Sequence, residues 1–320
     1  MTTPPHDGEA VTPPAAESAD AGRRDATGPK RRGPLAHNPD LDHLRIPPSD
    51  KCWWCGSKAD TQEHRFKHSS LRRVAAGKGP TNVFKVSNDY SGTLKSISKG
   101  VQVKWPKNLC ANCNGSRSQP FDYAYDEFEA FLFDNGSWLG GRSSLDWTEV
   151  FGEDWKVGAA NLARYFGKQL GCMLAAQNLL VPAELVQFLD GSQNCPSIGF
   201  SMARNWRGVS ADRVMRRHDR GGEGLMNFIG LLPAPAYTTE GRFSGIDYGC
   251  HIGYVWMVAT WRAESQQRAW FEQRELSLPL FNGSVREKLR WLPRLAGMEY
   301  KHAREKVASL TKLLPGKFKR

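Results

Sequence analysis

The chain has 320 residues, of which 40% are hydrophobic and 11% aromatic, and its formal net charge is +11. A chain of this length and composition buries a substantial core in one large or two smaller domains, which excludes a wholly disordered protein. Its apolar stretches are too short to cross a bilayer, and its first residues lack the basic start and apolar run of a leader. We therefore expect a cytoplasmic protein with no membrane partner.

The first 48 residues have the composition of a disordered tail. They are rich in Pro, Ala, Gly, Ser and Asp and have almost no apolar periodicity. Order is expected to begin at about residue 49, with a first domain over 49–138 and a second over 145–320.

Positive charge is concentrated in one segment of the first domain. Residues 51–120 contain 13 Lys and Arg against 3 Asp and Glu, whereas residues 121–160 have a net charge of −7. A basic field of this kind attracts a polyanion, so we expect a nucleic acid as partner. A solvated basic face explains the charge alone equally well.

Two Cys-x-x-Cys pairs are the strongest structural signal of the first domain. Cys52 and Cys55 are followed by Gly56, which suits a tight turn, and Cys110 and Cys113 form the second pair. Four thiolates are the soft ligands of a closed, structural zinc site. An odd total of seven cysteines also favours metal binding in a reducing compartment over disulfides. The remaining cysteines are expected in the core: Cys172, Cys195 and Cys250.

Short strands and a helix are expected between and after these pairs. Apolar residues in 83–86 and 101–105, with turn residues between them, predict an inserted β-hairpin over 82–105. A helix is expected to start at Ser118, because Pro120 suits a first turn, and to end at Asn135 and Gly136. Its core-facing residues recur at helical spacing: Phe121, Tyr125, Phe128 and Leu132.

The second domain is expected to be mixed α+β. Apolar residues at 162, 166, 170 and 173 predict an amphipathic helix, and 182–189 predicts another. The apolar run 252–261 predicts a buried strand. The region contains no phosphate-binding loop, dinucleotide fingerprint or nucleophile elbow, so we assign it no activity of its own.

The order of motifs in residues 50–135 resembles that of HNH endonucleases of the zinc-ribbon kind. The first cysteine pair with its glycine is followed by Glu63-His64, then by Asn108-Leu109, and the second cysteine pair is followed by Asn114. The resemblance implies a ββα-metal fold, which covers less than a third of the chain.

The resemblance also assigns roles to these residues. It implies that His64 is the general base, that Glu63 and Asn114 bind one catalytic Mg²⁺ or Mn²⁺, and that Asn108 braces the loop. The chemistry is reasonable, because an imidazole can deprotonate water near neutral pH and a hard cation can neutralise the scissile phosphate.

Two features depart from the usual HNH pattern. The acidic residue is Glu63 where Asp is commoner, and 43 residues separate His64 from Asn108. We attribute the long separation to the inserted hairpin. If that interpretation is wrong, Asn112 could replace Asn108 or Asn114.

Several basic residues near the motif are candidates for phosphate contacts. His68 would become a further metal ligand if its segment were helical, and is otherwise a surface residue or a phosphate contact. The side chains expected to clamp phosphates are Arg65, Lys67, Arg72, Arg73 and Arg117. Two further basic groups extend the track or are solvated: Arg213, Arg216, Arg217, His218 and Arg220, and Lys312, Lys317, Lys319 and Arg320.

Together these observations predict an α+β endonuclease that hydrolyses phosphodiester bonds, of DNA rather than RNA. The alternative is a zinc-ribbon nucleic-acid-binding protein without catalysis, in which Glu63 and His64 are incidental. Cutting both strands with one site would require a second copy of the chain, so a homodimer is compatible with this function.

Overall fold

A computed structural model describes residues 39–75, 84–87, 90–94, 96–100, 102–193, 195–218, 229–232, 235–264 and 270–281. It confirms a mixed α+β chain. No helix in these residues is long and apolar enough to span a membrane.

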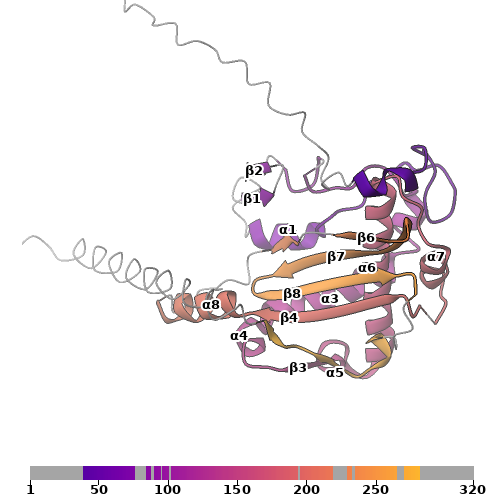
Figure 1. Cartoon of the computed structure of the whole chain (residues 1–320). Helices are drawn as coiled ribbons and strands as arrows, with labels where there is room; N and C mark the ends of the chain where they lie inside the picture. Colours follow the sequence, from indigo (N-terminus) through magenta and orange to yellow (C-terminus); the bar gives the residue numbers. More distant parts are fainter. Residues whose placement is uncertain are drawn as a thin grey trace, which may run out of the picture.

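A twisted sheet forms one layer of the molecule (Figure 1). Its strands run in the order β10-β4-β8-β7-β5, with β6 also paired to β7, and only β10 and β4 are parallel. The strands are β4 (Ile198–Asn205), β5 (Ile229–Leu231), β6 (Ala236–Thr239), β7 (Arg242–Ile252), β8 (Val255–Arg262) and β10 (Leu280–Phe281). Gly253, with φ of 54°, lies in the turn from β7 to β8. The predicted strand over 252–261 is therefore β8 together with the last residue of β7.

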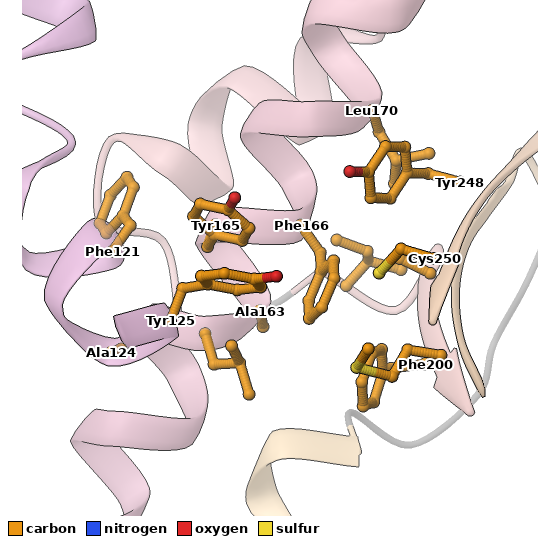
Figure 2. Close-up of a cluster of buried hydrophobic side chains, with 14 of the residues drawn as sticks. Phe121, Ala124, Tyr125, Ala163, Tyr165, Phe166, Leu170, Phe200, Tyr248 and Cys250 are labelled. Atoms are coloured by element: carbon orange, nitrogen blue, oxygen red, sulfur yellow. The ribbon is translucent and has the colours of Figure 1, made fainter. Parts of the chain in front are cut away.

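Helix α6 (Trp155–Ala176) is the centre of the fold, and α3 (Gln119–Asp134) packs beside it on the same side of the sheet (Figure 1). Every residue of α6 from 162 to 174 is buried. Tyr125 of α3 stacks on Tyr165 of α6 at 4.1 Å between ring centroids, and Phe166 contacts Phe200 of β4 at 4.8 Å (Figure 2). The two predicted helices are confirmed, but α6 is buried all round because it has neighbours on every side.

The ends of α3 follow the predicted signals. Ser118 is its N-cap, Pro120 lies in its first turn and Asn135 is its C-cap. The four predicted apolar residues of this helix are all buried. The helix predicted over 182–189 is α7 (Ala183–Leu189), with Pro182 before its first residue.

The remaining elements are short. They are η1 (Pro39–Leu44), α1 (His68–Ala75), β1 (Phe84–Ser87), β2 (Tyr90–Thr93), α2 (Ala111–Asn114), α4 (Gly136–Leu139), β3 (Ser144–Asp146), α5 (Trp147–Phe151), η3 (Gly152–Asp154), α8 (Trp206–His218), η5 (Trp270–Glu272) and β9 (Glu275–Ser277). Strands β3 and β9 form a separate antiparallel pair. The inserted hairpin is β1 and β2 alone. The expectation that 101–105 is its second strand is wrong, because backbone hydrogen bonds join Val103 and Trp105 to residues 63–65.

The two expected domains share one hydrophobic core. A single cluster of buried side chains includes Cys52, Trp54 and Phe121 from the first segment and Phe166 and Met257 from the second. The sequence suggested a boundary because composition changes near residue 145, but α3 and α6 bury their apolar faces against each other. The chain between 138 and 145 connects parts of one packed body.

The expected tail ends earlier than residue 48. Residues 1–38 lie outside the described residues, but η1 packs on the core through Leu41, which is fully buried. Arg45 donates to the carbonyl of Gln177, and His43 bonds to the carbonyl of Gly241. Leu41 and Leu44, three residues apart within an otherwise polar and proline-containing segment, were too few to indicate this anchoring.

Gly171 lets the first cysteine segment approach α6. A Cβ atom at this position would lie 2.4 Å from Cη2 of Trp53. We expect Gly171→Ala to lower the free energy of unfolding by about 1–3 kcal/mol, because this clash outweighs the better helix propensity of alanine. Urea denaturation measures the change. Gly141→Ala is the control, since its Cβ would meet its nearest neighbour, the carbonyl of Trp138, at 3.7 Å; equal effects at both positions would contradict the expectation.

Glu129 on α3 is 1% exposed, and burial raises the pKa of its carboxyl from 4.5 to about 7. The folded state therefore binds the proton more tightly than the unfolded state. This contribution to stability is present at low pH and is lost as the pH rises from about 4.5 to about 7. We expect Glu129→Gln to be more stable than wild type at pH 8 by up to about 3 kcal/mol, with a much smaller difference at pH 5. Urea denaturation at both pH values checks this, and a pH-independent difference would contradict it.

Candidate functional site

The four cysteines of the two Cys-x-x-Cys pairs lie together. Their sulfur atoms are all within 4.8 Å of one another, and Cys55 and Cys110 are separated by 3.6 Å. A tetrahedral ion with metal–sulfur bonds of about 2.3 Å requires sulfur–sulfur distances of about 3.8 Å. The set therefore fits a four-coordinate metal ion. Within the described ranges, no other group of three or more His, Cys, Asp or Glu side chains is close enough to hold one.

Local hydrogen bonds position the cysteine sulfurs and lower the pKa of one of them. Gly56 adopts a positive φ of 77°, and its amide donates to the carbonyl of Cys52 at 2.8 Å, which closes the first turn. Cys110 is the N-cap of α2 and accepts from the amide of Cys113 at 3.4 Å. Hydrogen bonds from Ser57 lower the pKa of Cys55 to about 6. A thiolate is thus accessible at neutral pH, which metal binding requires.

Arg117 belongs to the cysteine cluster. Its guanidinium donates to the sulfur of Cys113 at 3.2 Å, lies over the ring of Trp54 at 4.5 Å and pairs with Asp190. The positive charge stabilises nearby thiolates. These contacts place Arg117 beside the clustered sulfurs, where its guanidinium is already engaged.

Two extended segments run between the cysteine pairs and lie side by side. The amide of Trp105 donates to the carbonyl of Glu63 at 2.8 Å, and the amide of Arg65 donates to that of Val103 at 2.9 Å. Farther along, Thr61 and Leu109 are bridged in the same antiparallel sense. Each segment has a cysteine pair at one end, so a bound ion would fix both and the helices that follow.

Glu63 and His64 make contacts in different directions, as expected for successive side chains of an extended segment. The Glu63 carboxylate lies 3.2 Å from Nζ of Lys168 and accepts from Nε2 of Gln169 at 3.1 Å. Burial raises the pKa of Glu63, although Lys168 opposes the shift. Glu63 therefore faces α6, where its carboxylate is already satisfied.

His64 lies at the bridge to Lys104 and is half-buried. Its ring centroid is 5.5 Å from that of His68, the first residue of α1. Within the described part of the chain, its buried Nδ1 has no hydrogen-bond partner. Burial, together with Lys104 and His68, lowers its pKa to about 4. The imidazole is thus uncharged at neutral pH and able to accept a proton.

The asparagines occupy different environments. Asn108 is buried and donates from Nδ2 to the carbonyl of Cys172 at 2.9 Å, so it ties the second extended segment to α6. Asn114 ends α2, and its buried Oδ1 has no partner among the described groups. Asn112 is exposed. The role of Asn108 as a brace of the loop stays a prediction.

Two of the predicted phosphate-binding residues are held inside the structure. Arg65 is 3% exposed, lies over the ring of Trp105 at 4.6 Å and donates to the carbonyl of Lys104. Its expected contact with phosphate is therefore wrong, because the guanidinium does not reach the surface. Lys67 is mostly buried in an ion pair with Asp126 at 2.7 Å.

Other basic residues are more open. Arg72 is exposed on α1 and lies near His68, whose pKa is lowered by burial and by this arginine and Lys104. Arg73 is exposed but lies over Phe133 at 4.7 Å. Arg216 of α8 pairs with Asp212 at 2.8 Å. Four residues of the second basic group lie on α8: Arg213, Arg216, Arg217 and His218. Arg220 and the four basic residues of 312–320 lie outside the described residues.

The sequence analysis missed the residues that contact the Glu63–His64 pair from other elements. Lys168 and Gln169 come from α6 and Lys104 comes from the second extended segment, while Asp122 of α3 joins the group by pairing with Lys168. A signal was present for Lys168, because a charged residue within an otherwise apolar helix seldom becomes buried without a partner.

Comparisons with known proteins add no relative. No protein-family model matches the chain, and no curated protein or solved structure matches it significantly. The resemblance to HNH endonucleases therefore rests on the order of its motif residues.

Proposed function

We propose that the chain is an endonuclease that hydrolyses phosphodiester bonds of nucleic acid, with His64 as the general base. The proposal rests on the charge and the surroundings of the His64 imidazole. Its imidazole is uncharged, half-buried and beside His68. A neutral imidazole in this position can take a proton from an attacking water.

Zinc is the metal that we propose for the four cysteines. Four sulfur ligands at tetrahedral spacing are typical of structural zinc, and a closed site leaves no position for substrate. When bound, zinc would link the turn at Cys52 and Cys55 to α2. The ring of His64 would then be held beside that of His68, the first residue of α1.

The catalytic cation that the resemblance implies does not fit the residues as they are arranged. Glu63 would have to bind Mg²⁺ or Mn²⁺, but its carboxylate is paired with Lys168 and Gln169. Asn114 retains a free acceptor among the described groups, yet one amide oxygen is a weak cation site alone.

The surroundings of His64 suit an anionic substrate. The charge of Lys104 lowers the pKa of both His64 and His68, and that of Arg72, which is exposed, lowers the pKa of His68. A phosphodiester beside His64 would favour its protonated form and raise its pKa, which improves the base when substrate is bound. We propose DNA as the first substrate to test, with RNA as the second.

A non-catalytic zinc module that binds nucleic acid is the second candidate. It is favoured by the engagement of Glu63, because a nuclease of the HNH kind would use that carboxylate at the scissile phosphate. In this case Arg72 and Lys104 would bind the phosphate backbone without cleavage.

Incubation with labelled single-stranded and duplex oligonucleotides, DNA and RNA, separates the two candidates. The nuclease proposal expects shorter products from the wild type in buffer with and without added Mg²⁺, and none from His64→Ala. Salt-dependent retention of intact oligonucleotide by both proteins would favour the binding module instead.

A further inference from the structure

The central helix holds a fully buried ammonium group beside Glu63. Nζ of Lys168 lies 3.2 Å from Oε1 of Glu63, 3.0 Å from Oδ1 of Asp122 and 3.3 Å from Oγ of Ser118. The Lys168 side chain is 0% exposed. An ammonium has three N–H donors, and these three partners account for all of them.

The two carboxylates need a cation between them. Glu63 comes from the first extended segment and Asp122 from α3, and their side chains are only 12% and 25% exposed. Neighbouring carboxylates at such burial repel each other unless a positive charge or a shared proton intervenes. In many nucleic-acid enzymes a divalent ion meets this need. Here the ammonium of Lys168 already supplies the positive charge between the two carboxylates.

Lys168 has little freedom to leave this position. It belongs to the stretch of α6 in which every residue from 162 to 174 is buried, and its own side chain is 0% exposed. The next residue reinforces the contact, because Nε2 of Gln169 donates both to Glu63 Oε1 and to the carbonyl of His64, each at 3.1 Å. Helix α6 thus donates hydrogen bonds to both Glu63 and His64.

We propose that Lys168 is the resident cation of the Glu63–Asp122 carboxylate pair, and that the chain binds no divalent ion through Glu63. The inference concerns cation binding without nucleic acid, so its outcome is separate from that of the nuclease proposal.

Manganese binding tests this in the zinc-loaded protein. Electron paramagnetic resonance would count free Mn²⁺ during titration of the wild type and of Glu63→Gln, which keeps the shape of the side chain and its hydrogen bond from Gln169. We expect the two proteins to bind Mn²⁺ equally. Binding by the wild type that weakens about tenfold or more in Glu63→Gln, a loss of about 1.4 kcal/mol, would overturn the proposal.

Removal of the ammonium provides a second test. In Lys168→Ala the carboxylates of Glu63 and Asp122 are left unpaired, so we expect a lower melting temperature than that of the wild type. Mn²⁺ should raise the melting temperature of this variant, but should raise neither that of the wild type nor that of the double variant Lys168→Ala, Glu63→Gln. Equal shifts in wild type and variant, or a folded variant without any shift, would overturn the proposal. If Lys168→Ala does not fold, the Glu63→Gln titration decides alone.

Discussion

Cys110→Ser is expected to lose the metal ion and to have a melting temperature at least about 10 °C below that of the wild type. Cys110 is buried, caps α2 and lies 3.6 Å from Cys55, so its loss breaks the link between the two cysteine pairs. Structural zinc contributes about 10–16 kcal/mol in small zinc domains. Since these cysteines also pack on the common core, only part of that energy should be lost here, and about 1 kcal/mol already shifts the melting temperature by roughly 2–4 °C in a domain of 150–250 residues.

A matched control separates metal loss from the loss of a buried thiol. Cys250 is buried in β7 and lies outside the cluster, so Cys250→Ser should lose stability through burial of a hydroxyl and still retain one zinc per chain. Elemental analysis of both variants, with thermal denaturation, makes the comparison. Full zinc occupancy in Cys110→Ser would show that the four sulfurs are not the ligands.

His64→Ala is expected to lower the rate of nucleic-acid cleavage by about 100- to 10,000-fold, the usual contribution of a general base. The wild type should also remain active at a lower pH than a solvent-exposed histidine allows, because burial lowers the pKa of His64 to about 4. The acid limb of kcat/KM against pH reports this group in the free protein. If the acid limb lay near pH 6.5 in the wild type and only His64→Ala removed it, the low pKa of His64 would be contradicted.

The same shift affects stability. The folded-state pKa of His64 lies below the unfolded value, so the unfolded state binds the proton first and stability is lost as the pH falls from about 6.5 towards 4. His64→Ala should therefore lose less stability in this window than the wild type does. His43→Ala is a suitable control, because His43 is exposed and contacts the carbonyl of Gly241 far along the chain.

Parts of the structure with local signals were predictable from the sequence. The limits of α3 follow from a capping serine, an early proline and Asn135, and its buried face follows from residues at helical spacing. The paired spacing of Cys52 with Cys55, and of Cys110 with Cys113, was sufficient to predict their convergence. Each of these signals lies within a few positions of the sequence, and the shared chemistry of metal ligands predicted that the two cysteine pairs meet.

Apart from the meeting of the cysteine pairs, contacts between distant segments were not predictable. The pairing of residues 63–65 with 103–105 skips the β1–β2 hairpin, and alternation alone gives no partner for a strand. Arg65 has the sequence context of a phosphate-binding residue but lies under Trp105. The partner of Glu63 is Lys168, more than a hundred residues away on a helix predicted to be amphipathic. Only the packing of α6 in the centre of the fold brings this lysine to the site.

We expect the chain to hydrolyse phosphodiester bonds with His64 as the general base, held in a unit joined by four cysteines. The most direct measurement is the conversion of supercoiled plasmid into relaxed circles over time, with wild type and His64→Ala purified in parallel and matched in melting temperature and zinc content. We expect relaxed circles that increase with wild-type concentration, and no conversion by His64→Ala above the rate without protein. Equal conversion by both proteins, or none by either, would contradict it.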